Sequence, residues 1–207
     1  MTPPDRDWYI VRRWQSYVAE IRVVALRMAA IVVCYGLQLW HHFGLLDDAG
    51  RAANAEFHQQ ATLISCGWLF LSLAVWLILL RRWFPPALSY VSTAIDAALL
   101  TALIAASGGP TATQLDTFYF FIIILAGLRF DLPLVWFATL ACMVGFMASV
   151  GAVDEKWFDA EHAVPVISQG ITLVSLGAAG IVVGQIVRRA KDLAVAYAKR
   201  IEKGGEA

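Results

Sequence analysis

Six long apolar segments, separated by short polar or basic stretches, constrain this chain more than any other feature. A helix needs about 20 apolar residues to cross a bilayer, and most of these segments approach that length. They cover residues 28–46, 59–80, 87–107, 112–128, 132–153 and 163–187. The fourth segment is the weakest because it is short and contains Asp116. We therefore predict an all-α, polytopic membrane protein built as a six-transmembrane helix bundle.

The composition agrees with a chain that sits in a lipid bilayer. Only 15% of the residues are charged, whereas soluble domains carry about 25%. The formal net charge is zero, so bulk charge indicates no nucleic-acid partner. The short loops and tails contain no Walker, cyclase, kinase or HExxH motif. We expect a regulatory or binding module, not an enzyme.

Lys and Arg residues set the expected orientation, because cytoplasmic loops are enriched in them. With the N-terminus inside, only Arg51 and Lys156 fall in outer segments, and the pairs Arg81–Arg82 and Arg188–Arg189 end spans on the inner side. Both termini are therefore predicted to be cytoplasmic.

The apolar segments divide the chain into three parts. Residues 1–22 form an amphipathic N-terminal segment, which either lies on the inner membrane surface or extends the first span. Residues 23–187 form the transmembrane domain. Residues 188–207 form a cytoplasmic helix that leads to an effector or pairs with a second copy; the alternative is a helix that is simply solvated. The stretch "GIVVG" in the sixth span favours close helix packing, within one subunit or across a homodimer.

All histidines of the chain are predicted on the outer side of the membrane: His41, His42, His58 and His162. Imidazole binds haem iron and other transition metals. One or two b-type haems are therefore expected, with Arg51 and Lys156 pairing with propionates. Adjacent helical residues point about 100° apart, so His41 and His42 should serve different irons. The alternatives are a zinc or copper site that includes nearby carboxylates, and interfacial histidines that bond to water or lipid.

One carboxyl group falls in the middle of a span. Asp96 lies in "STAIDAALLTAL", and an ionisable residue at that depth indicates function. Asp96 either binds a quinone, a proton or a cation, or makes a structural hydrogen bond to a neighbouring helix. Asp116, Tyr119 and Gln169 lie closer to the outer face, where they form a candidate ligand or quinone pocket or serve only in helix packing.

Residues 81–189 resemble the six-span membrane anchors of bacterial class III adenylate cyclases and of some sensor kinases. The resemblance rests on "AIDAALLTALIAASGGPT", "FYFFIIILAGLRFDLPLVWF" and "GIVVGQIVRRAK". It implies a bacterial inner-membrane location and a cytoplasmic cyclase or kinase effector. One branch of these cyclases has a dihaem anchor that responds to quinone redox state, and the outer histidines are similar to that branch.

Two hypotheses follow from these residues. In the first, the chain is a membrane sensor that binds haem near the outer face and passes a redox or quinone signal to an effector. In the second, it is a haem-free receptor module that binds a small hydrophobic ligand or a partner protein through Asp96 and the outer pocket. An absorption spectrum distinguishes the two hypotheses.

Overall fold

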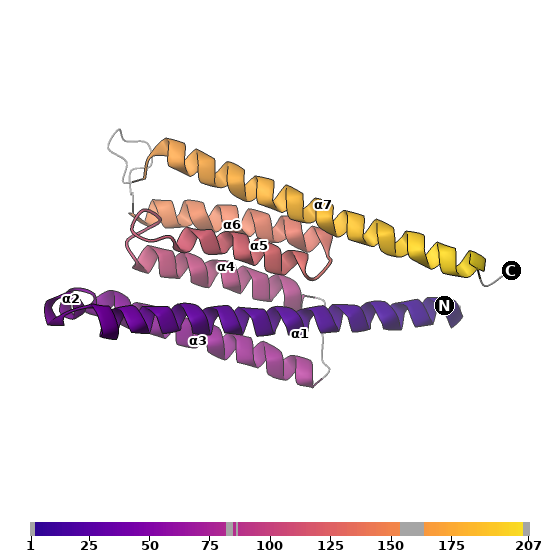
Figure 1. The fold of residues 1–207 in the computed structure, drawn as a ribbon, viewed down its shortest axis with the longest axis horizontal. Coiled ribbons are helices and arrows are strands. Elements are labelled where there is room, and N and C mark those ends of the chain that lie inside the picture. Colours follow the sequence, from indigo (N-terminus) through magenta and orange to yellow (C-terminus); the bar gives the residue numbers. More distant parts are fainter. Residues whose placement is uncertain (1–2, 82–84, 86, 154–163, 205–207) are drawn as a thin grey trace.

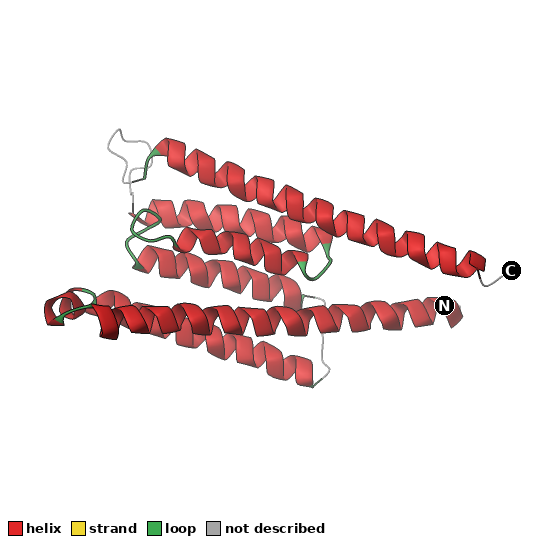
Figure 2. Cartoon of the chain, viewed as in Figure 1, coloured by secondary structure: helices red, strands yellow, loops and turns green. Residues whose placement is uncertain are grey.

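The computed structural model describes residues 3–81, 85, 87–153 and 164–204, and every regular element among them is a helix (Figure 2). The elements, in chain order, are α1 (Pro3–Trp40), η1 (His41–Leu45), α2 (Asp48–Ala53), α3 (Ala55–Leu80), α4 (Leu88–Ala106), η2 (Leu115–Thr117), α5 (Phe118–Gly127), α6 (Leu132–Val153) and α7 (Val166–Gly204). The prediction of an all-α chain is confirmed.

Five helical segments in the described part of the chain are long and apolar enough to cross a membrane. They are Tyr17–Leu45, Ala55–Leu80, Leu88–Ala106, Leu132–Val153 and Val166–Tyr197. These five segments overlap all the predicted spans except the fourth, 112–128. The structure therefore fits a multi-pass membrane protein.

The predicted fourth span is a shorter apolar helix, Leu115–Gly127. Turns shorten it at both ends. Before it, Gly108 and Gly109 adopt φ values of 90° and 99°, in the region that favours glycine. After it, Phe130 has a φ of 52°. The ten residues of α5 extend about 15 Å, roughly half of a bilayer's hydrocarbon thickness.

The helices form two groups that lie side by side (Figure 1). Helices α4, α5, α6 and α7 pack around a shared apolar core that includes Ile104, Ile123 and Phe146, all essentially inaccessible to solvent. Helices α1 and α3 pack on each other, and α3 also contacts α4. The N- and C-terminal ends of α1 and α7 lie at the same end of the molecule, where both helices extend beyond the rest (Figure 1).

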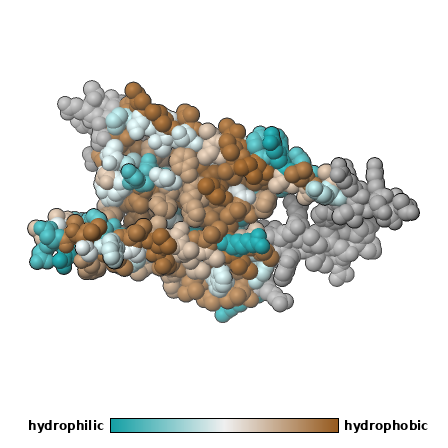
Figure 3. Space-filling model, in the orientation of Figure 1, coloured by the Kyte–Doolittle hydropathy of each residue, from teal (hydrophilic) through white to brown (hydrophobic). Residues whose placement is uncertain are grey.

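Helix α1 is continuous from Pro3 to Trp40, so the N-terminal stretch and the first predicted span belong to one helix. A short π-helical turn, His41–Leu45, continues it. Apolar side chains of α1 such as Val33 and Leu37 are exposed on the outside of the bundle. Apolar residues dominate the middle of the visible face, and hydrophilic residues gather mainly nearer the ends (Figure 3).

The glycines of "GIVVG" face a helix of the same chain. A Cβ at Gly180 would collide with the side chain of Thr139 on α6, and one at Gly184 would come within 3.3 Å of Leu132. Small residues allow such close backbone approach. The α6–α7 contact therefore uses this motif within one subunit, the first of the two alternatives.

Candidate functional site

Asp96 lies in a buried polar cluster formed by three helices. Both carboxylate oxygens of Asp96 on α4 accept hydrogen bonds from Nη1 of Arg27 on α1, at 3.0 and 2.9 Å. Nε1 of Trp68 on α3 donates to the same carboxylate at 2.7 Å. The side chains of Arg27 and Asp96 are each 4% exposed. The pair therefore joins α1 to α4 inside the bundle.

Sequence reasoning identified Asp96 but assigned Arg27 to an inner segment beside the first span. The sequence did contain one signal that could have identified Arg27 as a buried residue: its spacing of seven residues from Glu20. Glu20 and Arg27 are two helical turns apart on α1, so they lie on one face, and Val23 and Val24 between them are fully buried. Two opposite charges on a buried helical face predict buried partners on neighbouring helices.

Glu20 has such a partner. Nε and Nη2 of Arg129, in the turn after α5, donate to its carboxylate at 2.6 and 2.7 Å. Arg129 also donates to Thr93 Oγ1 at 2.8 Å and to Ser92 Oγ at 3.0 Å, both on α4. Two basic residues counted as inner charges, Arg27 and Arg129, are thus buried in ion pairs. The two pairs lie about 10 Å apart along α1 and tie it to α4 and to the turn after α5.

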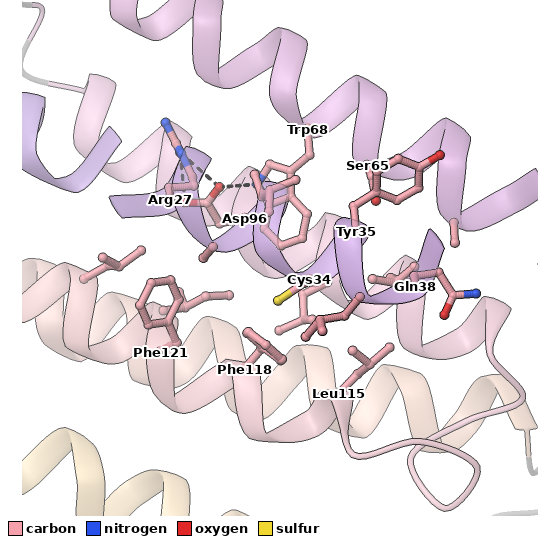
Figure 4. A pocket seen from close by; sticks show the side chains of 18 of the residues that line it. Arg27, Cys34, Tyr35, Gln38, Ser65, Trp68, Asp96, Leu115, Phe118 and Phe121 are labelled. Atoms are coloured by element: carbon pink, nitrogen blue, oxygen red, sulfur yellow. Dashed lines mark hydrogen bonds and ion pairs between the residues drawn. The ribbon is translucent and has the colours of Figure 1, made fainter. Parts of the chain in front are cut away.

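A cavity of about 350 Å³ lies between α1 and α3 on one side and α4 and α5 on the other (Figure 4). We refer to it as the α1 cavity. Its lining residues are predominantly apolar or aromatic: Arg27, Ala30, Ile31, Cys34, Tyr35, Leu37, Gln38, Phe57, Ala61, Ser65, Trp68, Asp96, Leu100, Leu103, Leu115, Phe118, Phe121, Ile122 and Leu125. Small-molecule sites have this size and composition, with few polar groups among apolar walls.

Two residues that line the α1 cavity also carry buried side-chain nitrogen atoms with no hydrogen-bond partner among the described residues. These atoms are Nε and Nη2 of Arg27 and Nε2 of Gln38, and all three are buried. Buried donors without partners are rare in proteins and call for an explanation. The cavity and the ion pair in its wall together make it the candidate ligand site.

The other candidate pocket residues lie elsewhere. Tyr119 is fully buried, and its hydroxyl is 2.8 Å from Thr101 Oγ1. Asp116 accepts a hydrogen bond from the adjacent Thr117 N–H, and Gln169 donates to the backbone oxygen of Val164. None of these three predicted residues lines the α1 cavity. Of the predicted ligand-pocket set, the structure brings only Asp96 to it.

The histidines follow the expected angular separation. His41 is exposed and His42 is buried. The ring of His42 stacks on that of His58, with centroids 4.0 Å apart and an interplanar angle of 2°. Both Nδ1 atoms are buried and have no partner among the described residues. His162 and Lys156 lie outside the described residues.

Haem ligation sets a geometric requirement on a pair of axial histidines, which must lie on opposite faces of the macrocycle with a nitrogen toward the iron. The stacked rings of His42 and His58 leave no space between them for a macrocycle. The side chain of Arg51 is engaged locally, with Leu46 O at 3.2 Å and Asp48 at 3.2 Å. In the described parts of the chain, no three His, Cys, Asp or Glu side chains form a metal-binding group. His42 and His58 thus do not fit one haem in this arrangement.

Comparisons of the chain with protein families, with curated proteins and with solved structures find no match. The resemblance to cyclase and kinase membrane anchors therefore stays a prediction, and the functional argument rests on the α1 cavity and its polar groups.

Proposed function

We propose that this chain is a membrane receptor module that binds a small apolar molecule in the α1 cavity. The observation that carries the proposal is an apolar cavity of about 350 Å³ with a buried Arg27–Asp96 ion pair in its wall. Ionisable groups at such a depth are costly and are usually retained for function. Leu37 lines the cavity and is 65% exposed, so a ligand has access from the side that faces lipid.

Two helices connect the α1 cavity to the end of the molecule where both termini lie. Helix α1 forms one wall and continues beyond the bundle (Figure 1). Helix α5 forms the opposite wall and packs against α7, where Gly127 faces Val183. Occupancy of the cavity shifts α1 and α7 relative to each other, and this movement reaches a cytoplasmic effector such as a cyclase or kinase. Pairing of α7 with a second copy makes the receptor a homodimer.

The proposed topology has six crossings, with α5 as the short one, and cytoplasmic termini in the inner membrane of a bacterium. Two observations support it: the N-terminal end of α1 and the C-terminal end of α7 lie at the same end of the molecule (Figure 1), and the pair Arg188–Arg189 lies in the C-terminal half of α7. Positive residues favour the cytoplasmic side.

The proposed function can be tested by a substitution that places a large side chain in the α1 cavity. Ala30 lines the cavity, whereas its neighbour Ala29 is exposed and does not. We expect Ala30→Phe to lower saturable binding of radiolabelled methyl decanoate to detergent-solubilised protein by about tenfold or more, since the phenyl ring occupies the site. Ala29→Phe is the matched control and should bind like the wild type. Equal binding by both variants contradicts the proposal.

The haem hypothesis is tested on the same protein. The measurement is a reduced-minus-oxidised absorption spectrum. Haem bands that disappear in His42→Ala and His58→Ala would establish haem ligation by these histidines. The haem site would then lie outside the α1 cavity. We expect no such bands, because the stacked rings do not fit as a pair of axial ligands.

A further inference from the structure

Aromatic rings from two sides of the bundle line the α1 cavity. Trp68 comes from α3, whereas Phe118 and Phe121 come from α5 on the opposite side (Figure 4). Each of these residues lines the cavity and is only partly buried, so its ring has surface that a bound molecule can contact. The chemistry of the ligand can therefore be inferred from these rings.

The polar atoms of the aromatic residues are already used within the protein. Nε1 of Trp68 donates a hydrogen bond to Asp96 at 2.7 Å. The hydroxyl of Tyr35, which also lines the cavity, is 2.9 Å from Thr62 Oγ1. The phenylalanine side chains have no polar atom. These residues therefore offer ring carbons to a ligand, and not hydrogen bonds.

The two phenylalanines of α5 are oriented almost at right angles. Their ring centroids are 6.5 Å apart, and the angle between the ring planes is 81°. Aromatic rings attract one another in offset-stacked and in edge-to-face arrangements. A flat ring that stacks on Phe118 meets Phe121 edge-to-face, and the reverse also holds, so an aromatic ligand can make both contacts. A saturated ring has no π system and makes neither.

Charge restricts the ligand further. Among the described residues that line the cavity, the only charged side chains are Arg27 and Asp96, and they form an ion pair at 2.9 Å. A charged ligand would find no free counter-ion in these walls, and an unpaired charge in an apolar cavity is strongly unfavourable. The ligand is therefore neutral.

From these observations we infer that the α1 cavity binds a neutral molecule with an aromatic ring, which packs against Phe118 and Phe121 of α5 on one side and Trp68 of α3 on the other. The inference rests on the proposed function, and it names the ligand class.

Competition on the wild-type protein tests the inference with naphthalene and decahydronaphthalene, which have the same carbon skeleton. Each competes with radiolabelled methyl decanoate for detergent-solubilised protein. Their concentrations are expressed as mole fractions in the micelle, so the transfer of both hydrocarbons out of water cancels. We expect naphthalene to displace the ester about tenfold more effectively, the gain from favourable contacts with two aromatic rings.

Two substitutions show whether the rings cause this preference. Phe118→Leu and Phe121→Leu each remove one ring but keep an apolar side chain in the wall. Each should lower the preference for naphthalene by about two- to tenfold, while saturable binding of methyl decanoate shows that the variant is folded. Phe70→Leu is the matched control, because Phe70 lies on α3 outside the cavity and is 70% exposed. It should keep the wild-type preference.

Equal displacement by the two hydrocarbons in the wild type overturns the inference but leaves the proposed function intact. Stronger displacement by dodecane than by naphthalene also overturns it, because the ligand is then an extended chain. A preference for naphthalene that survives both phenylalanine substitutions does the same, since the rings are then not its source. Absence of saturable methyl decanoate binding to the wild type overturns both the inference and the proposed function.

Discussion

At the scale of single residues, α1 is held to the rest of the bundle by charges. Arg27 and Glu20 are both buried and both paired with residues far away in sequence, Asp96 and Arg129. Removing one member of a buried pair leaves an uncompensated charge, whereas replacing both members by apolar residues is often neutral. This asymmetry makes the Arg27–Asp96 pair testable by a double-mutant cycle.

We expect Arg27→Met to destabilise the protein by about 3–5 kcal/mol, because Asp96 then stays buried without its partner. The double variant Arg27→Met/Asp96→Leu should recover most of that loss. Thermal unfolding in detergent, followed by circular dichroism, measures both. Arg22→Met, at an exposed position of the same helix, is the control and should have almost no effect. A double variant as unstable as the single one would contradict the paired arrangement.

At the scale of helices, α6 and α7 approach closely because of one glycine. Gly180 leaves no room for a Cβ beside Thr139, whereas nothing lies within 4 Å of a Cβ at Gly177. Both residues are in α7, so the intrinsic helix preference for Ala over Gly, about 1 kcal/mol, applies equally to both. Any difference between the two substitutions therefore reports the α6–α7 contact.

We predict that Gly180→Ala lowers the free energy of unfolding by about 1–3 kcal/mol relative to Gly177→Ala, because the added methyl group forces the two helices apart. Gly177→Ala should match or exceed the wild type. Chemical unfolding of the two variants in mixed micelles measures the difference. Identical stabilities would mean that Thr139 and α7 separate without cost.

At the scale of the whole molecule, the helix order places α2 and the end of α7 at opposite ends of the bundle (Figure 1). Because the apolar helices between them fit a bilayer, these two ends should lie on opposite sides of the membrane. This arrangement follows from the number of crossings and does not depend on the identity of the ligand.

Cysteine labelling checks the arrangement. In a background that lacks Cys34, Cys66 and Cys142, we expect Ala49→Cys in α2 to react with a membrane-impermeant maleimide added to intact cells. Ala194→Cys in α7 should react only after permeabilisation. Both positions are exposed. Labelling of both from outside would show an odd number of crossings and would exclude α5 as a crossing helix.

The histidines and the Arg27–Asp96 pair show which features could be predicted from the sequence and which could not. The 100° step of a helix correctly predicted that His41 and His42 face different directions, because that property is local. The same helical geometry could not predict that His42 stacks on His58, because this contact depends on how α1 and α3 pack. Likewise, the depth of Asp96 could be read from its span, but its partner Arg27 could not. Arg27 borders the first apolar segment, and the charge pattern alone counts it among the inner basic residues.

The sequence by itself determined the helical class, the apolar segments and the ends where basic residues gather. These properties depend on runs of consecutive residues, since each membrane helix satisfies its own backbone hydrogen bonds. Only the tertiary structure decided which charges pair and where the α1 cavity lies. Such features join residues as far apart as Arg27 and Asp96, and the packing of whole helices determines whether those residues meet.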